Sequence, residues 1–169
     1  MPNNFSRRDF LQLSGLGLSA MAITTDPLGV ASDFLKPKHL GLQLWSVRDD
    51  MNKDAAGTLQ ALAKMGYCEV EPFGYNPETG KIFGLPLADF AKLVKANGMK
   101  IPSSHNNFKL SDYNAATKGL SDRGKKIIDA AAGLGQKYII NAYLDEPERS
   151  KTKEIIQLME AAAKYARQA

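Results

Sequence analysis

The chain has 169 residues, of which 44% are hydrophobic and 24% are charged. This composition is typical of a folded globular protein with one core and excludes a largely disordered chain. The formal net charge of +4 comes from 22 Lys and Arg against 18 Asp and Glu, with no basic run interleaved with aromatic residues. Nucleic acid binding is therefore not indicated. The single cysteine, Cys68, excludes an intrachain disulfide and a cysteine-based metal site.

The N-terminal residues have the pattern of a targeting signal. Residues 6–12, SRRDFLQ, are a twin-arginine sequence, and a weakly hydrophobic stretch follows over residues 11–23. That stretch is shorter than the roughly 20 residues that a membrane-spanning helix needs, so no stable membrane span is expected. We predict a Tat signal peptide over residues 1–31, cleaved after Ala31 or after Ala22, and a periplasmic or exported protein.

The first expected strand begins at residue 40. Leucines alternate there with Gly41, Gln43 and Trp45, and this period of two residues is typical of a β-strand with two different faces. One face is then apolar, and the other carries an amide and an indole. The strand is expected to run into a charged loop at residues 48–50. A polar face followed by a polar loop is typical of the rim of a binding cavity.

The rest of the chain alternates between helical and strand patterns. Apolar residues at helical spacing, with glycines at most of the helix ends, predict the helices. The expected helices cover residues 54–65, 87–97, 120–134 and a segment that begins at 147 or 148. The expected further strands cover residues 67–71, 99–104 and 138–142. Two long polar loops, 72–86 and 106–119, lie between them, and loops of this length in compact domains usually have a function.

Successive strand and helix units imply parallel strands with right-handed crossovers. Two architectures fit this order, a doubly wound open sheet and a (β/α)8 barrel. No G-x-G-x-x-G follows the first strand, where residues 46–50 are SVRDD, and this excludes a Rossmann dinucleotide site. A complete barrel needs about 200 residues or more, so residues 32–169 are too few. We predict an α/β fold with about four parallel (β/α) units, which is half a TIM barrel.

Glu71 and His105 are the predicted catalytic residues. Both are expected at the C-terminal ends of strands, where the active sites of barrels lie. A carboxylate at this position could bind a sugar hydroxyl, take a proton from carbon or support a metal ligand, or it could only pair with a neighbouring cation. A histidine there could act as an acid or base, bind a metal or hold the substrate, or it could have only a structural role.

Gln43, Trp45 and Asn141 are the predicted substrate-binding residues. Flat aromatic rings stack on the apolar faces of sugars, and amides hydrogen-bond to sugar hydroxyls, so Gln43 and Trp45 on one strand face suit a carbohydrate. The alternative to sugar binding is a structural role, in which Trp45 fills the core and Gln43 makes its hydrogen bonds within the protein. Asn141 ends the fourth expected strand and could contribute in the same way.

Several segments together resemble a known family. They are GLQLWSVRD at 41–49, GTL at 57–59, MGY at 65–67, EVE at 69–71 and SSH at 103–105, behind the twin-arginine leader. They look like the corresponding parts of exported sugar phosphate isomerases/epimerases of the xylose-isomerase-like TIM-barrel superfamily. The resemblance runs from residue 40 to the end of the chain and is most specific in its first forty residues.

The resemblance implies a (β/α)8 barrel that acts on a sugar, polyol or related keto compound by proton transfer. It also implies a divalent metal, Mn, Zn, Mg or Co, at the C-terminal mouth of the barrel. In the family this metal is held by carboxylates and a histidine from later strands, so no residue of this chain is assigned as a metal ligand. Residues 32–169 are then the N-terminal part of the barrel domain, and the chain alone is expected to be an inactive fragment.

Two functions from different classes remain open at this point. The first is an isomerase or epimerase with a small sugar or polyol substrate, active at full length. The second is a non-catalytic carbohydrate-binding or scaffold module on the same fold, because a fold does not determine a function. The sequence leaves open whether several copies of the chain assemble into a homo-oligomer.

Overall fold

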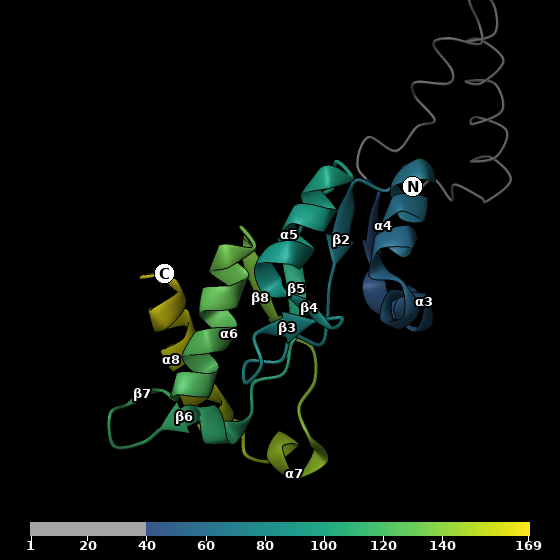
Figure 1. The fold of residues 1–169 in the computed structure, drawn as a ribbon. Helices are drawn as coiled ribbons and strands as arrows, with labels where there is room; N and C mark the ends of the chain where they lie inside the picture. Colours follow the sequence, from purple (N-terminus) through teal and green to yellow (C-terminus); the bar gives the residue numbers. More distant parts are fainter. Residues whose placement is uncertain (1–39) are drawn as a thin grey trace, which may run out of the picture. The chain divides into compact units, whose positions relative to one another are not determined.

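The computed structural model describes residues 40–169 (Figure 1). The predicted signal peptide at 1–31, its two cleavage sites and the expected start of the domain at residue 32 lie outside these residues. Within the described part of the chain, no helix is long and apolar enough to cross a membrane.

Four parallel strands form the centre of the fold. They are β1 (Gly41–Gln43), β2 (Glu69–Glu71), β5 (Ser103–Asn106) and β8 (Tyr138–Asn141). β1 pairs with β2, and β5 pairs with β8. Two isolated parallel bridges, Glu69 to Lys100 and Phe73 to His105, join the β2 segment to the β5 segment. The strands therefore follow one another in chain order with parallel pairings, which confirms the predicted (β/α) units of a half barrel.

Helices alternate with these strands in the sequence. In Figure 1 the helices α4, α5, α6 and α8 lie in a row in chain order. The α-helices are α3 (Arg48–Lys53), α4 (Ala55–Lys64), α5 (Leu87–Ala96), α6 (Asp122–Gly133), α7 (Glu146–Arg149) and α8 (Thr152–Ala166). Two 3-10 helices are η1 (Leu44–Val47) and η2 (Leu110–Asp112). The helix expected from residue 147 is therefore divided into α7 and α8.

Local sequence signals explain where the main helices begin and end. The side chain of Asp54 accepts the backbone N–H of Gly57 at 2.9 Å and caps α4, and Ser121 caps α6 by accepting the N–H of Gly124 at 3.1 Å. Gly98, with φ of 70°, follows α5, and this left-handed conformation, which glycine adopts without steric cost, ends the helix.

Three local expectations were wrong in their details. The segment after β1 is helical rather than a charged loop, because Gln43 caps η1 with its side chain and Asp49 lies in the first turn of α3, where a negative charge is favourable. β1 ends at Gln43, so Trp45 lies in η1 and not on the strand. β5 begins later than expected and includes His105.

The two long loops carry short antiparallel hairpins. The first hairpin is β3 (Lys81–Ile82) with β4 (Leu85–Pro86), and the second is β6 (Tyr113–Asn114) with β7 (Gly119–Leu120). Both loops leave the C-terminal ends of central strands, so they lie near the expected mouth of the barrel.

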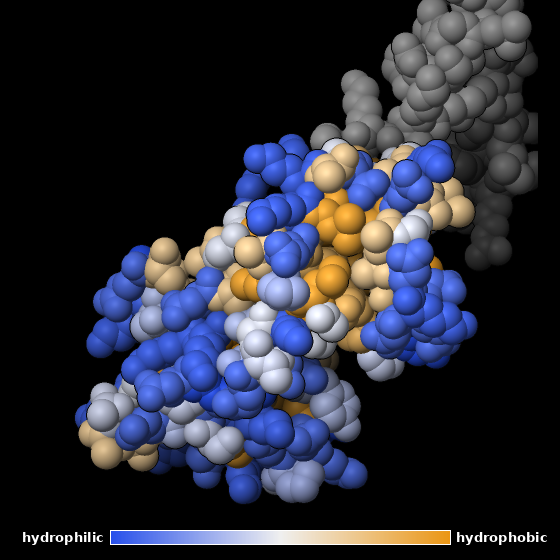
Figure 2. Space-filling view, viewed as in Figure 1, coloured by the Kyte–Doolittle hydropathy of each residue, from blue (hydrophilic) through white to orange (hydrophobic). Residues whose placement is uncertain are grey.

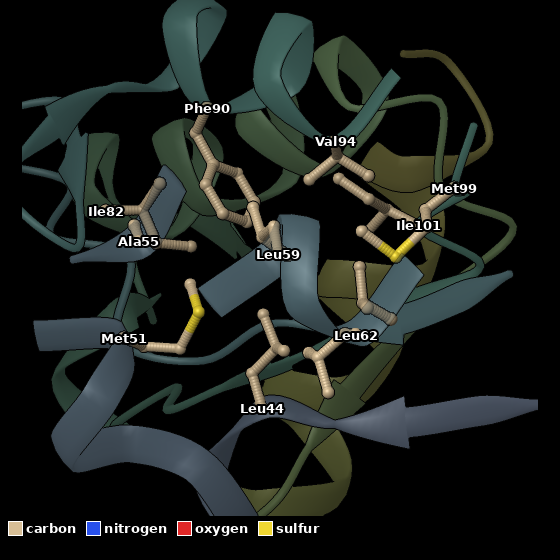
Figure 3. Packing of buried hydrophobic residues seen from close by; sticks show 11 residues of the cluster. Leu44, Met51, Ala55, Leu59, Leu62, Ile82, Phe90, Val94, Met99 and Ile101 are labelled. Atoms are coloured by element: carbon tan, nitrogen blue, oxygen red, sulfur yellow. The ribbon is translucent and has the colours of Figure 1, made fainter. Parts of the chain in front are cut away.

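The buried apolar residues form two clusters. The first lies among α3, α4, β2 and α5 (Figure 3), and its members are Leu44, Met51, Ala55, Leu59, Leu62, Val70, Ile82, Phe90, Val94, Met99 and Ile101. The second joins α6 to α8, and its members are Phe108, Leu120, Ile127, Ile128, Leu158 and Ala161. Figure 2 shows a strip of hydrophobic residues between α4 and α5 on a face that is otherwise mainly hydrophilic.

A buried carboxylate holds the loop after β5 against α6. Asp112 is 1% exposed and accepts hydrogen bonds from the guanidinium of Arg123, the hydroxyl of Ser121 and the backbone N–H of Lys109. Arg123 also donates to the backbone carbonyl of Asn107 at 3.3 Å. The segment directly after His105 is therefore fixed by a charged network, since a buried carboxylate is stable only when it is paired and hydrogen-bonded.

We predict that Asp112→Ala lowers the free energy of unfolding by about 2 to 4 kcal/mol, because three donors lose their acceptor in a buried site. Urea unfolding followed by circular dichroism measures this change. Asp122→Ala is the matched control, since its side chain is 93% exposed and pairs only with Lys125 at the surface. Asp122 lies in the first turn of α6, so its loss should cost no more than about 1 kcal/mol, and an equal effect of both variants would contradict the role of Asp112.

The outer strands of this sheet have free edges. Among residues 40–169, β1 pairs only with β2, and β8 pairs only with β5. An apolar cavity of about 430 Å³ lies beside β8, between α6 and α8, and Tyr138 on β8 is 66% exposed. Free strand edges next to apolar surface favour association with further strands.

We therefore predict that the isolated 169-residue chain forms dimers or larger assemblies. Size-exclusion chromatography with light scattering tests this, and a monomer at all concentrations would contradict it. Tyr138→Lys should shift the equilibrium toward monomer, because a charge on an edge strand opposes strand addition. Tyr143→Lys, an exposed position outside the strands, is the control and should leave the assembly unchanged.

Candidate functional site

Glu71 and His105 lie side by side at the C-terminal ends of β2 and β5. The Nε2 atom of His105 is 2.8 Å from Oε1 of Glu71, and the two side chains are 35% and 20% exposed. Alternation along each strand puts both on the sheet face opposite to the one that holds Val70 in the core. The structure thus brings the two predicted catalytic residues into direct contact, and their catalytic role stays a prediction.

Gln43 joins this pair from β1. Its Nε2 atom is 3.2 Å from Nδ1 of His105, and its Oε1 atom accepts the backbone N–H of Trp45 at 2.8 Å. The parallel register sets Gln43 opposite Glu71, so three neighbouring strands each supply one polar side chain to the same face.

Ser103 is a member of the site that the sequence did not indicate. It is 8% exposed on β5, two residues before His105, and its hydroxyl donates to Oε2 of Glu71. Serine is common in strands and loops, so the presence of a serine at this position does not by itself indicate a functional site. The spacing of two residues from His105 was the available clue, because it places both side chains on one strand face.

The polar face forms a shallow depression of about 240 Å³. Its lining residues are Gly41, Leu42, Gln43, Glu69, Val70, Glu71, Pro102 and Ser103. Gly41 and Glu69 stand opposite each other in the register at the end of the strands away from His105. The depression therefore extends along the strands from Glu71, which contacts His105, toward Gly41 and Glu69.

Trp45 lies at the rim beyond the end of β1. It is 54% exposed, and its ring packs edge-on against Phe73, with ring centroids 4.9 Å apart. The guanidinium of Arg48 lies 5.2 Å from the centre of the Trp45 ring, at a distance typical of a cation–π contact. An exposed indole beside Gln43 keeps the prediction of a sugar contact open, although the two residues do not share a strand face.

Asn141 is not brought together with these residues. Asn141 is two residues after Ile139 on β8, so both side chains lie on the same strand face, and Ile139 packs against the second apolar cluster. The Oδ1 atom of Asn141 accepts the backbone N–H of Phe108 at 3.0 Å. This bond fixes the loop after β5 to the end of β8. The predicted contact of Asn141 with substrate is not tested by this arrangement, but the side chain already has a structural partner.

Tyr75 lies in the loop after β2 and is half-buried. Burial, and secondly the negative charge of Asp129, raise the pKa of the Tyr75 hydroxyl above its ordinary value of 10.0. The phenol is therefore neutral over the physiological pH range and offers a hydrogen-bond donor rather than a charge. In the same loop Asn76 accepts the backbone N–H groups of Glu78 and Thr79, which shapes the turn before β3.

Among the solved structures that are similar to this chain, two are described as sugar phosphate isomerase/epimerase from Parabacteroides distasonis ATCC 8503. The first has a TM-score of 0.64 and 27% sequence identity, and the match covers 77% of this chain and 50% of the other. The second has a TM-score of 0.57 and 26% identity, over 78% of this chain and 49% of the other. No protein-family model and no curated protein matches the chain.

The chain thus spans about half the length of the solved structures that it matches. These matches confirm the resemblance to sugar phosphate isomerases/epimerases and the partial barrel predicted from the sequence. The alternative of a non-catalytic carbohydrate-binding module is not favoured by them.

The described residues do not by themselves fit a divalent metal. Within residues 40–169 no three His, Cys, Asp or Glu side chains lie close enough to hold one ion. Glu71 and His105 make a pair, but the nitrogen and oxygen that face each other at 2.8 Å are joined by a hydrogen bond. A catalytic metal site has about three protein ligands and an open position.

We predict that the chain alone binds divalent metal weakly, because a pair of ligands that are bonded to each other makes an incomplete site. Calorimetric titration with Mn²⁺ and with Zn²⁺ measures the affinity. A single stoichiometric site of micromolar or tighter affinity, lost in Glu71→Gln and kept in the exposed control Glu78→Gln, would contradict the prediction.

Proposed function

We propose that this chain is the N-terminal half of a sugar or sugar phosphate isomerase/epimerase that works by proton transfer on a sugar or polyol-like substrate. The contact between Glu71 and His105 at the C-terminal ends of adjacent parallel strands is the observation that carries the proposal. In barrels this is the end at which catalytic residues lie. The similarity to two structures described as sugar phosphate isomerase/epimerase supports the substrate class.

In the proposed reaction the carboxylate of Glu71 takes a proton from the carbon next to the carbonyl group of the substrate. The C–H bond breaks, its electron pair remains on the substrate as an enediol-type anion, and return of the proton to carbon completes an isomerisation or epimerisation. No oxidant or reductant is needed. His105 holds the carboxylate through its Nε2 atom, and the half-buried position of the pair raises the strength of its hydrogen bonds relative to water.

Two further parts of the proposal concern the protein outside residues 40–169. A divalent metal, if the complete protein uses one, takes most of its ligands from outside this chain. Residues 1–31 act as a Tat signal, so that the protein works in the periplasm or outside the cell. Their twin-arginine sequence supports this localisation.

Trp45 gives a direct test of binding, because it is the single tryptophan of the chain and lies at the rim of the site. We predict that one or more members of a panel of aldoses, ketoses, their monophosphates and polyols change the emission of Trp45 in a saturable way. Glu71→Gln and His105→Asn should weaken this binding at least about tenfold, since each removes a hydrogen-bond partner of a charged group.

The matched control is Glu78→Gln, which changes an exposed carboxylate in the loop after β2. This variant should bind as the unmodified chain does. Saturable binding that persists in both Glu71→Gln and His105→Asn, or a panel without any binding member, would contradict the proposed site.

A further inference from the structure

We propose that Gln43 and Ser103 are positioning residues for the Glu71–His105 pair, and that Gln43 and Glu71 together hold the imidazole tautomer with its proton on Nε2. This inference deepens the proposed function and depends on it only for what the pair does to a substrate. The hydrogen bonds that support it lie entirely within this chain and require no substrate.

The backbone of Trp45 sets the direction of the hydrogen bonds. A backbone N–H can only donate, so the atom of Gln43 that lies 2.8 Å from it must be the amide oxygen. The amide nitrogen of Gln43 then faces Nδ1 of His105 at 3.2 Å. Because an amide NH2 group has no acceptor capacity, Nδ1 must accept this bond. The neutral ring therefore carries its proton on Nε2.

The other end of the pattern is set by Glu71. Nε2 of His105 lies 2.8 Å from Oε1 of Glu71, and the hydroxyl of Ser103 donates to Oε2. An ionised carboxylate only accepts hydrogen bonds, so both contacts run toward Glu71. From the Gln43 amide to the Glu71 carboxylate, each donor thus meets an acceptor.

The two members of the pair are not equivalent in this arrangement. Both ring nitrogens of His105 are occupied, one by Gln43 and one by Glu71. Each oxygen of Glu71 uses one lone pair and keeps another, because a carboxylate has about four acceptor positions. Glu71 can therefore accept a proton, or a hydrogen bond that a ligand hydroxyl donates, without loss of its present bonds. His105 cannot act directly unless one of its bonds breaks.

Gln43 and Ser103 hold the pair from opposite sides. Gln43 belongs to β1 and fixes the rotation of the imidazole, and Ser103 belongs to β5 and fixes the rotation of the carboxylate. Ser103 is buried, so water does not compete strongly for its hydroxyl. Neither residue needs to touch the substrate for this role.

Nitrogen NMR on the 169-residue chain with ¹⁵N-labelled histidine tests the tautomer directly. The chain has two histidines, and His39→Gln assigns the signals of His105. In alkaline buffer, Nδ1 of His105 should show the shift of an unprotonated nitrogen, and Nε2 should show the shift and proton coupling of an N–H. A protonated Nδ1, or an averaged mixture of tautomers, in the unmodified chain would overturn the proposal.

Substitutions then separate the two positioning roles. Gln43→Leu removes the donor at similar size. Glu71 still keeps the proton on Nε2, but the ring is no longer held at Nδ1, so exchange of the Nε2 proton with water should become faster. Gln43→Glu presents only acceptors and should add a proton to Nδ1 while Nε2 keeps its own. Ser103→Ala should keep the tautomer but speed exchange of the Nε2 proton with water, because Glu71 is then held on one side only. Unchanged exchange in Gln43→Leu together with an unprotonated Nδ1 in Gln43→Glu would overturn the role of Gln43. Unchanged exchange in Ser103→Ala would overturn the role of Ser103.

Gln60→Leu on the exposed side of α4 and Ser111→Ala in η2 are the matched controls, since both side chains are exposed. Neither should change the signals of His105. Far-UV circular dichroism establishes that each variant is folded, and the measurement on the unmodified chain decides the tautomer even if a variant does not fold. No substrate is used, so failure of the sugar-binding experiment leaves this result unaffected.

Discussion

The backbone pairing between the β2 and β5 segments is the contact on which the site depends. The N–H of Val70 donates to the carbonyl of Lys100, and the N–H of His105 donates to the carbonyl of Pro72, each at 2.9 Å. Because the two segments are parallel, their C-terminal ends meet at one edge of the sheet. A shift of one residue in this register would turn His105 toward the helices and separate it from Glu71.

The strand β5 carries polar residues on both of its faces, and the residues on the two faces have different hydrogen-bond partners. Ser104 donates to the side-chain oxygen of Gln136 at 2.8 Å and accepts from Asn106 at 2.9 Å, on the face that the helices cover. The side chains of Ser104 and Asn106 are satisfied in this way, whereas the side-chain nitrogen of Gln136 is buried without a hydrogen-bond partner among the described residues. Ser103 and His105 point to the other face and bond to Glu71, which keeps acceptor positions free. The second set therefore offers acceptor positions to a ligand on the face that the helices leave open.

The sequence predicted the parts of this structure that depend on short-range patterns. The strand patterns placed Gln43 on the polar face of the first strand and Glu71 and His105 at the C-terminal ends of two later strands, and helical spacing with terminal glycines located most helices. The parts that depend on contacts between distant segments were missed. The place of Ser103 beside Glu71 requires the register between β2 and β5, and the end of β1 before Trp45 follows from a side-chain cap by Gln43 that a strand pattern does not contain.

Trp45 at the rim of the site is held by aromatic packing, whereas the Glu71–His105 pair is held by hydrogen bonds, so the two parts of the site can have separate roles. Trp45 packs on Phe73 and Phe73 on Phe83, with ring centroids 4.9 and 5.0 Å apart, and Phe83 in turn contacts Phe90 in the first core cluster. Trp45 contributes to the orientation of Gln43 only through its backbone N–H, which every residue except proline provides. The indole can therefore contact a ligand, or be exchanged for another side chain, while the tautomer and orientation of the Glu71–His105 pair are retained.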